Sequence, residues 1–220
     1  MFEAYIHVPF CIRRCGYCDF NTYTAVDMGA GASRGNYANM VIREMSIVHD
    51  WQIAHGVNEP EAATVFFGGG TPTILKASDL VAILNAVRDT WGIADNAEIT
   101  TEANPDTVNA DYVKELADGG FNRISFGMQS AVPHVLATLD RTHTPENVAA
   151  GIAAANAAGM RSSVDLIYGA PGESLDDWRT SVPHRHRFGR QPYFRICAHH
   201  RAEYENGTTD RGGHVVETGR

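Results

Sequence analysis

Three cysteines lie within eight residues near the amino terminus of the chain. Cys11, Cys15 and Cys18 form the stretch CIRRCGYC, with C-x3-C-x2-C spacing, and Cys197 is the fourth cysteine of the sequence. Three thiolates on one loop can converge on one metal centre. The same loop holds two arginines and a glycine, which argues against three buried and inert thiols. The spacing therefore predicts a metal site.

Two kinds of metal centre suit three clustered cysteines. A structural zinc ion takes four ligands and is usually held by paired C-x2-C units. His7 is a candidate for the fourth ligand, but it lies within a predicted strand. An iron–sulfur cube normally takes four thiolates, so three cysteines leave one iron open to a substrate. We favour the cluster and keep zinc as the alternative.

A glycine-rich turn and a set of polar residues are candidates for ligand binding. The turn FFGGGTPT lacks the lysine of a phosphate-binding P-loop, and its glycines expose backbone groups to a close ligand. Parallel sheets bind ligands at the carboxyl ends of their strands. A carboxylate there suits ribose hydroxyls or an ammonium group, and an arginine suits a carboxylate. The polar residues at or just beyond predicted strands are Glu102, Gln129, Arg141 and Asp165.

Alternating apolar and amphipathic stretches predict the elements that hold these residues. Repeated strand–helix units predict a parallel α/β sheet with right-handed crossovers. Five or six units suit a partial barrel, since a full eightfold barrel takes about 250 residues. The predicted strands are 3–8, 63–67, 97–102, 122–128 and 162–168. The predicted helices are 37–53, one capped by Ser78, 110–118, 146–158 and one from Ser174.

Composition excludes several functional classes. The 220 residues carry a net charge of -8 and are 44% hydrophobic, which is ordinary for a globular protein with one substantial core. The acidic balance argues against nucleic acid as a partner. No apolar run approaches the roughly 18 residues of a transmembrane helix, and we find no secretion signal. We therefore expect a cytoplasmic protein, in which clustered cysteines bind metal or do chemistry.

The cysteine spacing, with Tyr17 just before the third cysteine, resembles the signature of the radical S-adenosylmethionine (SAM) superfamily. The resemblance runs from about Tyr5 to Val182. It implies a partial (β/α)6 barrel and a [4Fe–4S] cluster on Cys11, Cys15 and Cys18. In that superfamily SAM chelates the open iron, and an electron from the cluster splits it into methionine and a 5′-deoxyadenosyl radical. The residues implied to contact SAM are Tyr5, Tyr17, Gly69, Gly70, Thr71, Glu102, Gln129, Arg141 and Asp165.

The stretch YIHVPFC, followed by CDFNTY, looks like the branch that contains heme chaperones and oxygen-independent coproporphyrinogen III oxidases. The oxidases have a further cysteine at the position of Phe20, so this chain resembles the heme chaperones, which bind heme and transfer it to acceptor proteins. The oxidase, which decarboxylates two propionates of a porphyrinogen, and an inactive fragment are the alternatives. We find no HNxxY-type heme motif, and the heme ligands, electron donor and heme acceptor stay unassigned.

The segment 183–220 differs from the rest of the chain. It holds seven arginines and five histidines, and its apolar residues follow no period. We therefore divide the chain into a core, residues 1–182, and a tail, residues 183–220, expected to be poorly ordered. Written as degenerate codons and read one base later, the tail can encode SGVNHISAYALIIE, a continuation typical of the family. A frameshift would leave the barrel incomplete, without a sixth strand or a C-terminal domain.

Overall fold

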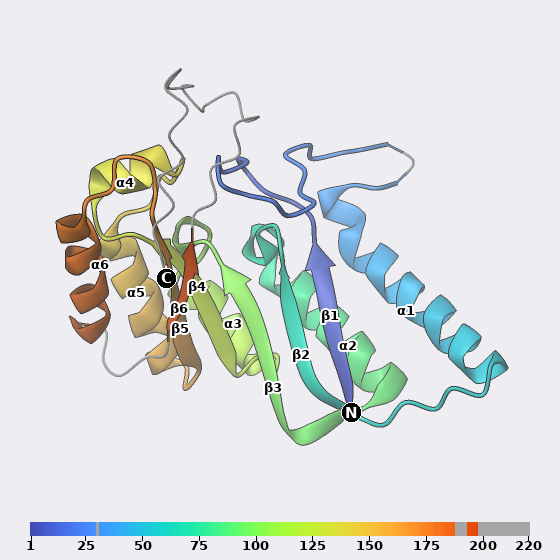
Figure 1. The fold of residues 1–220 in the computed structure, drawn as a ribbon. Helices are drawn as coiled ribbons and strands as arrows, with labels where there is room; N and C mark the ends of the chain where they lie inside the picture. Colours follow the sequence, from blue (N-terminus) through green and yellow to red (C-terminus); the bar gives the residue numbers. More distant parts are fainter. Residues whose placement is uncertain (30, 188–192, 198–220) are drawn as a thin grey trace.

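The computed structural model describes residues 1–29, 31–187 and 193–197 of the chain. They form one six-stranded parallel sheet whose strand order follows the chain order. The strands are β1 (Phe2–Val8), β2 (Ala62–Gly69), β3 (Ile93–Ala103), β4 (Arg123–Gln129), β5 (Arg161–Tyr168) and β6 (Tyr193–Cys197). All strands therefore end at the same edge, at the top of Figure 1, where the cysteine loop also lies.

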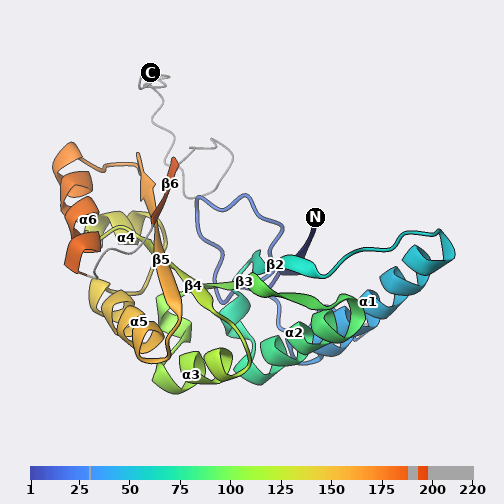
Figure 2. The same ribbon diagram turned by 90° about the horizontal axis from the view of Figure 1, so that it is seen from below.

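Helices connect the strands and cover one side of the sheet. Figure 2 shows the strands following an open arc, with the longer helices along its outer side. The helices are α1 (Tyr37–Ala54), α2 (Ala77–Trp91), α3 (Ala110–Asp118), α4 (Pro133–Thr138), α5 (Pro145–Ala157) and α6 (Leu175–Arg187). Short 3-10 turns cover Arg34–Asn36, Pro72–Ile74 and Pro105–Thr107. The arrangement confirms the predicted α/β partial barrel.

The core lies between the sheet and these helices. Phe67 of β2 and Phe126 of β4 are fully buried and belong to the same apolar cluster as Leu84 of α2 and Val113 of α3. Four apolar residues of α2 recur at helical spacing, Leu80, Ile83, Leu84 and Val87, and none is exposed. Each such side chain contributes about 1.5–3 kcal/mol by burial. This layer fixes the curvature of the sheet, and with it the positions of the strand ends.

The inner side of the central strands is polar. Because side chains alternate along a strand, the residues between the core positions face the opposite side. On β3, β4 and β5 these residues are Thr100, Glu102, Arg123, Ser125, Ser163 and Asp165, which are linked by hydrogen bonds or by charge. A polar inner face is suited to a ligand and not to a second apolar layer.

The structure corrects two sequence predictions within the core. Ser78 is not the cap of α2, because the helix begins at Ala77 and the carbonyl of Lys76 accepts the first hydrogen bonds, from the N–H groups of Asp79 and Leu80. Helix α4 was not predicted, since its six residues are too few to show a helical period. The other boundaries differ from the predicted ones by a few residues.

The structure describes a sixth strand, which the frameshift hypothesis leaves out. Tyr193–Cys197 pairs in parallel with Val164–Tyr168 of β5, and α6 extends to Arg187. The five residues of β6 include tyrosine, phenylalanine and isoleucine, which favour strands, and pairing uses backbone groups that almost any residue offers. The tail, residues 183–220, is expected to be poorly ordered. Most of it, 188–192 and 198–220, lies outside the described residues. Among the described helices, none has the length and apolarity to cross a membrane.

Candidate functional site

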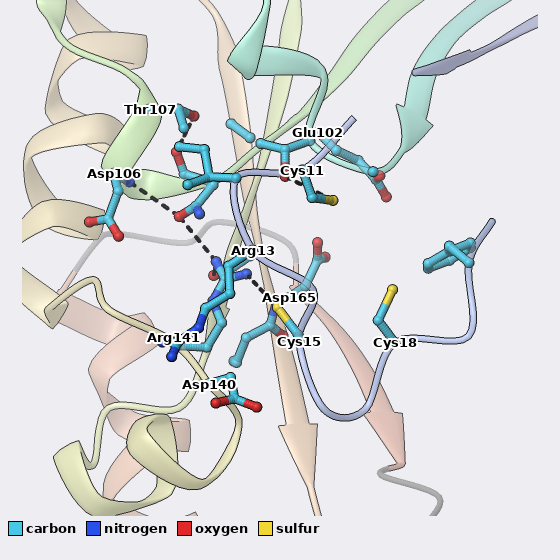
Figure 3. Close-up of a pocket in the computed structure, with 18 of the residues that line it drawn as sticks. Cys11, Arg13, Cys15, Cys18, Glu102, Asp106, Thr107, Asp140, Arg141 and Asp165 are labelled. Atoms are coloured by element: carbon cyan, nitrogen blue, oxygen red, sulfur yellow. Dashed lines mark hydrogen bonds between the residues drawn. The ribbon is translucent and has the colours of Figure 1, made fainter. Parts of the chain in front are cut away.

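A cavity of about 290 Å³ lies at the carboxyl ends of the strands. Its wall combines the cysteine loop after β1, the glycine turn after β2 and the ends of β3, β4 and β5. Figure 3 shows the three cysteines and the charged residues Glu102, Arg141 and Asp165 around this space. Parallel sheets place their ligands at this edge, so the cavity is the candidate site.

Backbone hydrogen bonds hold the cysteine loop in place. The N–H of Cys11 donates to the carbonyl of Tyr23 over 2.9 Å, and the N–H of Tyr23 donates to the carbonyl of Pro9 over 2.7 Å. Within the loop, the N–H of Cys18 donates to the carbonyl of Cys15 over 3.1 Å. The two ends of the loop are thus tied together beside β1, with the thiols between them.

The three thiols line the cavity at separate points. Cys11 is buried, and its sulfur accepts a hydrogen bond from Thr71 Oγ1 at 3.7 Å. Burial raises the pKa of the Cys11 thiol, the Thr71 hydrogen bond lowers it, and the nearby Cys15 and Cys18 raise it further. Among the described residues, no three His, Cys, Asp or Glu side chains gather tightly enough for a single metal ion. A cubane cluster binds each cysteine at a different iron, so separated thiols around one space fit it.

The glycine turn is hydrogen bonded to the cysteine loop. The N–H of Gly70 donates to the carbonyl of Val8 over 2.7 Å, and the N–H of Thr71 donates to the carbonyl of Phe10 over 2.8 Å. A Cβ at Gly70 would lie 2.6 Å from the Phe10 carbonyl oxygen. Gly70 is therefore required by the close approach of two backbones. The cysteine loop fills the space into which a Cβ at Gly70 would point, and Gly70 also lines the cavity.

Two carboxylates share the inner wall of the cavity. Burial, with a contribution from the charge of Asp165, raises the pKa of Glu102 to about 7. Burial raises the pKa of Asp165 to about 6, against the opposing effects of a Ser125 hydrogen bond and the Arg123 charge. Glu102 also accepts a hydrogen bond from the N–H of Gly69 at 3.3 Å. Such a pair is suited to binding hydroxyl or ammonium donors.

Arg141 provides the positive charge of the site. Its Nη1 lies 3.7 Å from the Cys15 sulfur, and its Nη2 donates to Asn104 Oδ1 and to the Gly127 carbonyl, both at 3.1 Å. Its Nε lies 3.4 Å from Nδ1 of His143. Burial, followed by the charge of Arg141, lowers the pKa of His143 to about 4, so this ring stays neutral and can accept that hydrogen bond.

Left-handed backbone occurs beside the cavity. Among the described residues, Gln129 and Asp140 are the non-glycine residues with positive φ, at 62° and 56°, and both line the cavity. Gln129 is 8% exposed, and its Oε1 has no hydrogen-bond partner. Strained backbone of this kind persists where the surrounding structure requires it, typically at ligand sites. The amide oxygen Oε1 of Gln129 is therefore a candidate acceptor for a ligand in the cavity.

Most of the predicted SAM-contact residues lie in this cavity. Eight of the nine line it, from Tyr17 to Asp165, and so do Cys11, Cys15 and Cys18. Tyr5 is not among the lining residues, and its side chain is 55% exposed. Its hydroxyl is hydrogen bonded to Nδ1 of His7 at 3.0 Å, and its ring stacks on Phe66. Burial raises the pKa of Tyr17.

Sequence reasoning missed several residues of the site. Asn104 and Asp106 follow Glu102 in the stretch TEANPDT and line the cavity. Both come just after a predicted strand, and this position could have identified them as candidate site residues. The position of His143 in the sequence does not indicate a site residue, because its contact with Arg141 depends on the folded structure. Asp140 lies beside the cysteine loop, where a Cβ on Gly16 would be 3.1 Å from its carboxylate.

Comparisons with known proteins agree with this geometry. The model of the radical SAM superfamily matches residues 5–182. The heme chaperone HemW of Mycobacterium tuberculosis is 44% identical over 182 residues, which are 82% of this chain and 45% of that protein. HemW of Escherichia coli is 36% identical over 176 residues, 80% of this chain and 44% of that protein. The chain thus spans less than half the length of these relatives.

A solved structure shares the fold. Coproporphyrinogen III oxidase (HemN) from Escherichia coli, described as a radical SAM enzyme, superposes with a TM-score of 0.80 at 22% identity, over 91% of this chain and 44% of that one. The match to residues 5–182 covers well over half of the chain, and the HemW relatives align with 82% and 80% of it. The chain therefore belongs to the radical SAM superfamily, and HemW proteins are among its relatives.

Proposed function

We propose that the chain is a [4Fe–4S] protein of the heme chaperone type, which binds SAM and heme and passes heme to an acceptor protein. Membership of the radical SAM superfamily implies the cluster and SAM. The observation that carries the proposal is the cavity, because three cysteines and eight predicted SAM-contact residues line one space. The similarity to HemW supports the heme part of the proposal.

Different residues of the cavity would bind different groups of the cluster and of SAM. Cys11, Cys15 and Cys18 would hold the cluster, which supplies an electron to SAM when it is bound. Arg141 offers donors to a carboxylate beside Cys15. Glu102 and Asp165 offer acceptors to ribose hydroxyls or an ammonium group. Gln129 offers its Oε1, which has no hydrogen-bond partner among the described residues.

Phe20 is the residue that favours the heme chaperone function over the oxidase function. It lines the cavity at the position where the oxidase has a further cysteine, and it is 58% exposed. The likeness to HemN concerns the fold, so the oxidase reaction is the second candidate and heme delivery the first. An inactive form of the chain is the third candidate, and the experiment below separates it from the other two.

The proposal places the protein in the cytoplasm, because a reducing compartment keeps clustered thiols available for iron. Its partners would be heme or a porphyrin, an electron donor and a heme acceptor protein.

Anaerobic reconstitution tests the proposal. The full chain is treated with iron and sulfide, and cluster absorbance, SAM binding, 5′-deoxyadenosine formation and binding of added hemin are measured. We expect a cluster, SAM binding and a heme absorbance band, with coproporphyrinogen left unchanged. A chain that formed a cluster and decarboxylated coproporphyrinogen would show the oxidase instead. A chain that held iron but bound neither SAM nor hemin would support the inactive fragment.

A further inference from the structure

A chain of hydrogen bonds runs along the inner face of the sheet and ends at Asp165. It starts far from the cavity, where Nη2 of Arg161 lies 3.1 Å from one oxygen of Glu98. The other oxygen of Glu98 lies 3.2 Å from Nη1 of Arg123. Nη2 of Arg123 then donates to Ser163 Oγ over 2.8 Å. The arginine thus connects an ion pair at the start of the strands with a serine nearer their ends.

Two serines complete the path to the carboxylate. Ser163 Oγ donates to Ser125 Oγ over 2.8 Å, and Ser125 Oγ lies 3.1 and 3.2 Å from the two oxygens of Asp165. The register of β4 and β5 explains this geometry, because Ser125 pairs with Ser163, whereas Asp165 pairs with Gly127. Gly127 has no side chain to contact Asp165, so the nearest hydroxyl is that of Ser125.

The two ends of the chain together set the direction of its hydrogen bonds. An arginine can only donate, so Ser163 accepts from Arg123, and an ionised carboxylate can only accept, so Ser125 donates its one proton to Asp165. The remaining hydrogen bond then runs from the Ser163 hydroxyl to Ser125 Oγ. Hydrogen bonds aligned in one direction polarise and strengthen one another. The exposed fractions are 8% for Arg123, 4% for Ser125 and 0% for Ser163, so solvent has little access to compete.

We propose that Arg123 is a positioning residue of the SAM site, which acts through Ser163 and Ser125 to orient the Asp165 carboxylate as an acceptor. This inference rests on the proposed function, in which Asp165 binds SAM. The group of the ligand that meets Asp165 is then a hydrogen-bond donor, a hydroxyl or an ammonium. Arg123 itself lines no part of the cavity.

A plain ion pair between Arg123 and Glu98 that only stabilises the sheet is the competing explanation. It predicts that the serines matter little to Asp165. The neighbouring Ser162 offers a matched control, because it is also 0% exposed, yet in the described part of the chain its hydroxyl has no hydrogen-bond partner. Ser162→Ala removes a buried hydroxyl from the same strand without touching the chain.

The first test follows the titration of Asp165 in the protein without cluster or SAM, by NMR of 13C-labelled carboxyl groups. The described groups that influence or lie near Asp165 are Ser125 and Arg123 on β4, Glu102 on β3, and Arg141 and Cys15 of the cavity wall. We expect Ser125→Ala and Ser163→Ala each to raise the pKa of Asp165, and the double variant to raise it little beyond Ser125→Ala. Ser162→Ala should leave it unchanged. An unchanged pKa in Ser163→Ala would overturn the proposal.

The second test measures SAM affinity of the reconstituted chain by calorimetry. We expect Ser163→Ala and Arg123→Gln to weaken binding about tenfold, a change of about 1.4 kcal/mol, with partial recovery in Arg123→Lys. Thermal unfolding shows whether each variant is folded. Equal affinity of wild type and Ser163→Ala would overturn the proposal. A wild-type chain that failed to bind SAM would refute the proposed function, while the Asp165 titration would still decide whether Arg123 positions this carboxylate.

Discussion

At the scale of single residues, the site depends on side chains brought together from distant parts of the sequence. Arg141 contacts the sulfur of Cys15, which lies 126 positions away in the sequence. Asp165 accepts a hydrogen bond from Ser125, which lies 40 positions away. The sequence predicted the residue types, because polar residues after apolar runs mark strand ends. It could not predict that His143 holds Arg141, since that contact depends on how the segment after β4 folds.

The cysteines give the first prediction. Alanine at Cys11, Cys15 or Cys18 should abolish cluster absorbance after anaerobic reconstitution, because each thiolate holds a different iron. Cys197→Ala is the control and should keep the cluster. The measurement is the visible spectrum together with bound iron. A full cluster in Cys15→Ala would contradict the assignment.

The carboxylate pair gives the second prediction. The pKa of Glu102 is raised on folding, so the native state binds more protons than the unfolded state between about pH 4.5 and pH 7. Its contribution to stability is therefore present at low pH and is lost as the pH rises through 7. Glu102→Gln should stabilise the cluster-free protein at pH 8, by about 1–3 kcal/mol, and little at pH 4.

Urea unfolding at the two pH values measures this difference. Glu115→Gln on α3, where the side chain is exposed, is the control and should change stability equally at both. A Glu102→Gln protein with the same stability as wild type at pH 8 would show that the carboxylate is not destabilised by burial.

At the scale of elements, local pattern predicted the strands and the longer helices because each has an apolar face of regular period. The residues 110–118 form α3 as predicted, and Tyr37 begins α1 as predicted. The pattern failed for α4, which is too short for a period, and for β6, whose pairing is made by backbone groups. It also did not indicate that Gly70 packs against the backbone of Val8 and Phe10, because a contact between two loops produces no periodic pattern in either segment.

Gly70 gives the third prediction. A valine there would meet the carbonyl oxygens of Phe10 and Val8, so the glycine turn and the cysteine loop would have to separate. We expect Gly70→Val to cost about 1–3 kcal/mol of stability and to weaken cluster retention. Gly35→Val is the matched control, because nothing lies within 4 Å of a Cβ at Gly35. Thermal unfolding and the iron content after desalting measure both effects.

At the scale of the whole molecule, the match to the superfamily ends at residue 182, and the aligned part of the chain covers 45% and 44% of the two HemW relatives. The predicted shift of reading frame after this point remains a proposal.

The nucleotide sequence around codons 180 to 184 supplies the fourth prediction. If a base has been lost or gained there, the alternative frame should continue downstream and encode SGVNHISAYALIIE followed by a C-terminal domain. Early stop codons in that frame would refute the frameshift, and the arginine- and histidine-rich segment would then need a function of its own. Resequencing of the gene decides between the two.

The ties between the cysteine loop and its surroundings have a consequence for how iron is acquired. The N–H groups of Gly70, Tyr23 and Thr71 donate to the carbonyls of Val8, Pro9 and Phe10, and the N–H of Cys11 donates back to the carbonyl of Tyr23. These hydrogen bonds join backbone groups and use no thiol, so the entropy of closing the loop is lost when the chain folds. Such a preorganised receptor should accept a ready-made cube from a donor with little rearrangement.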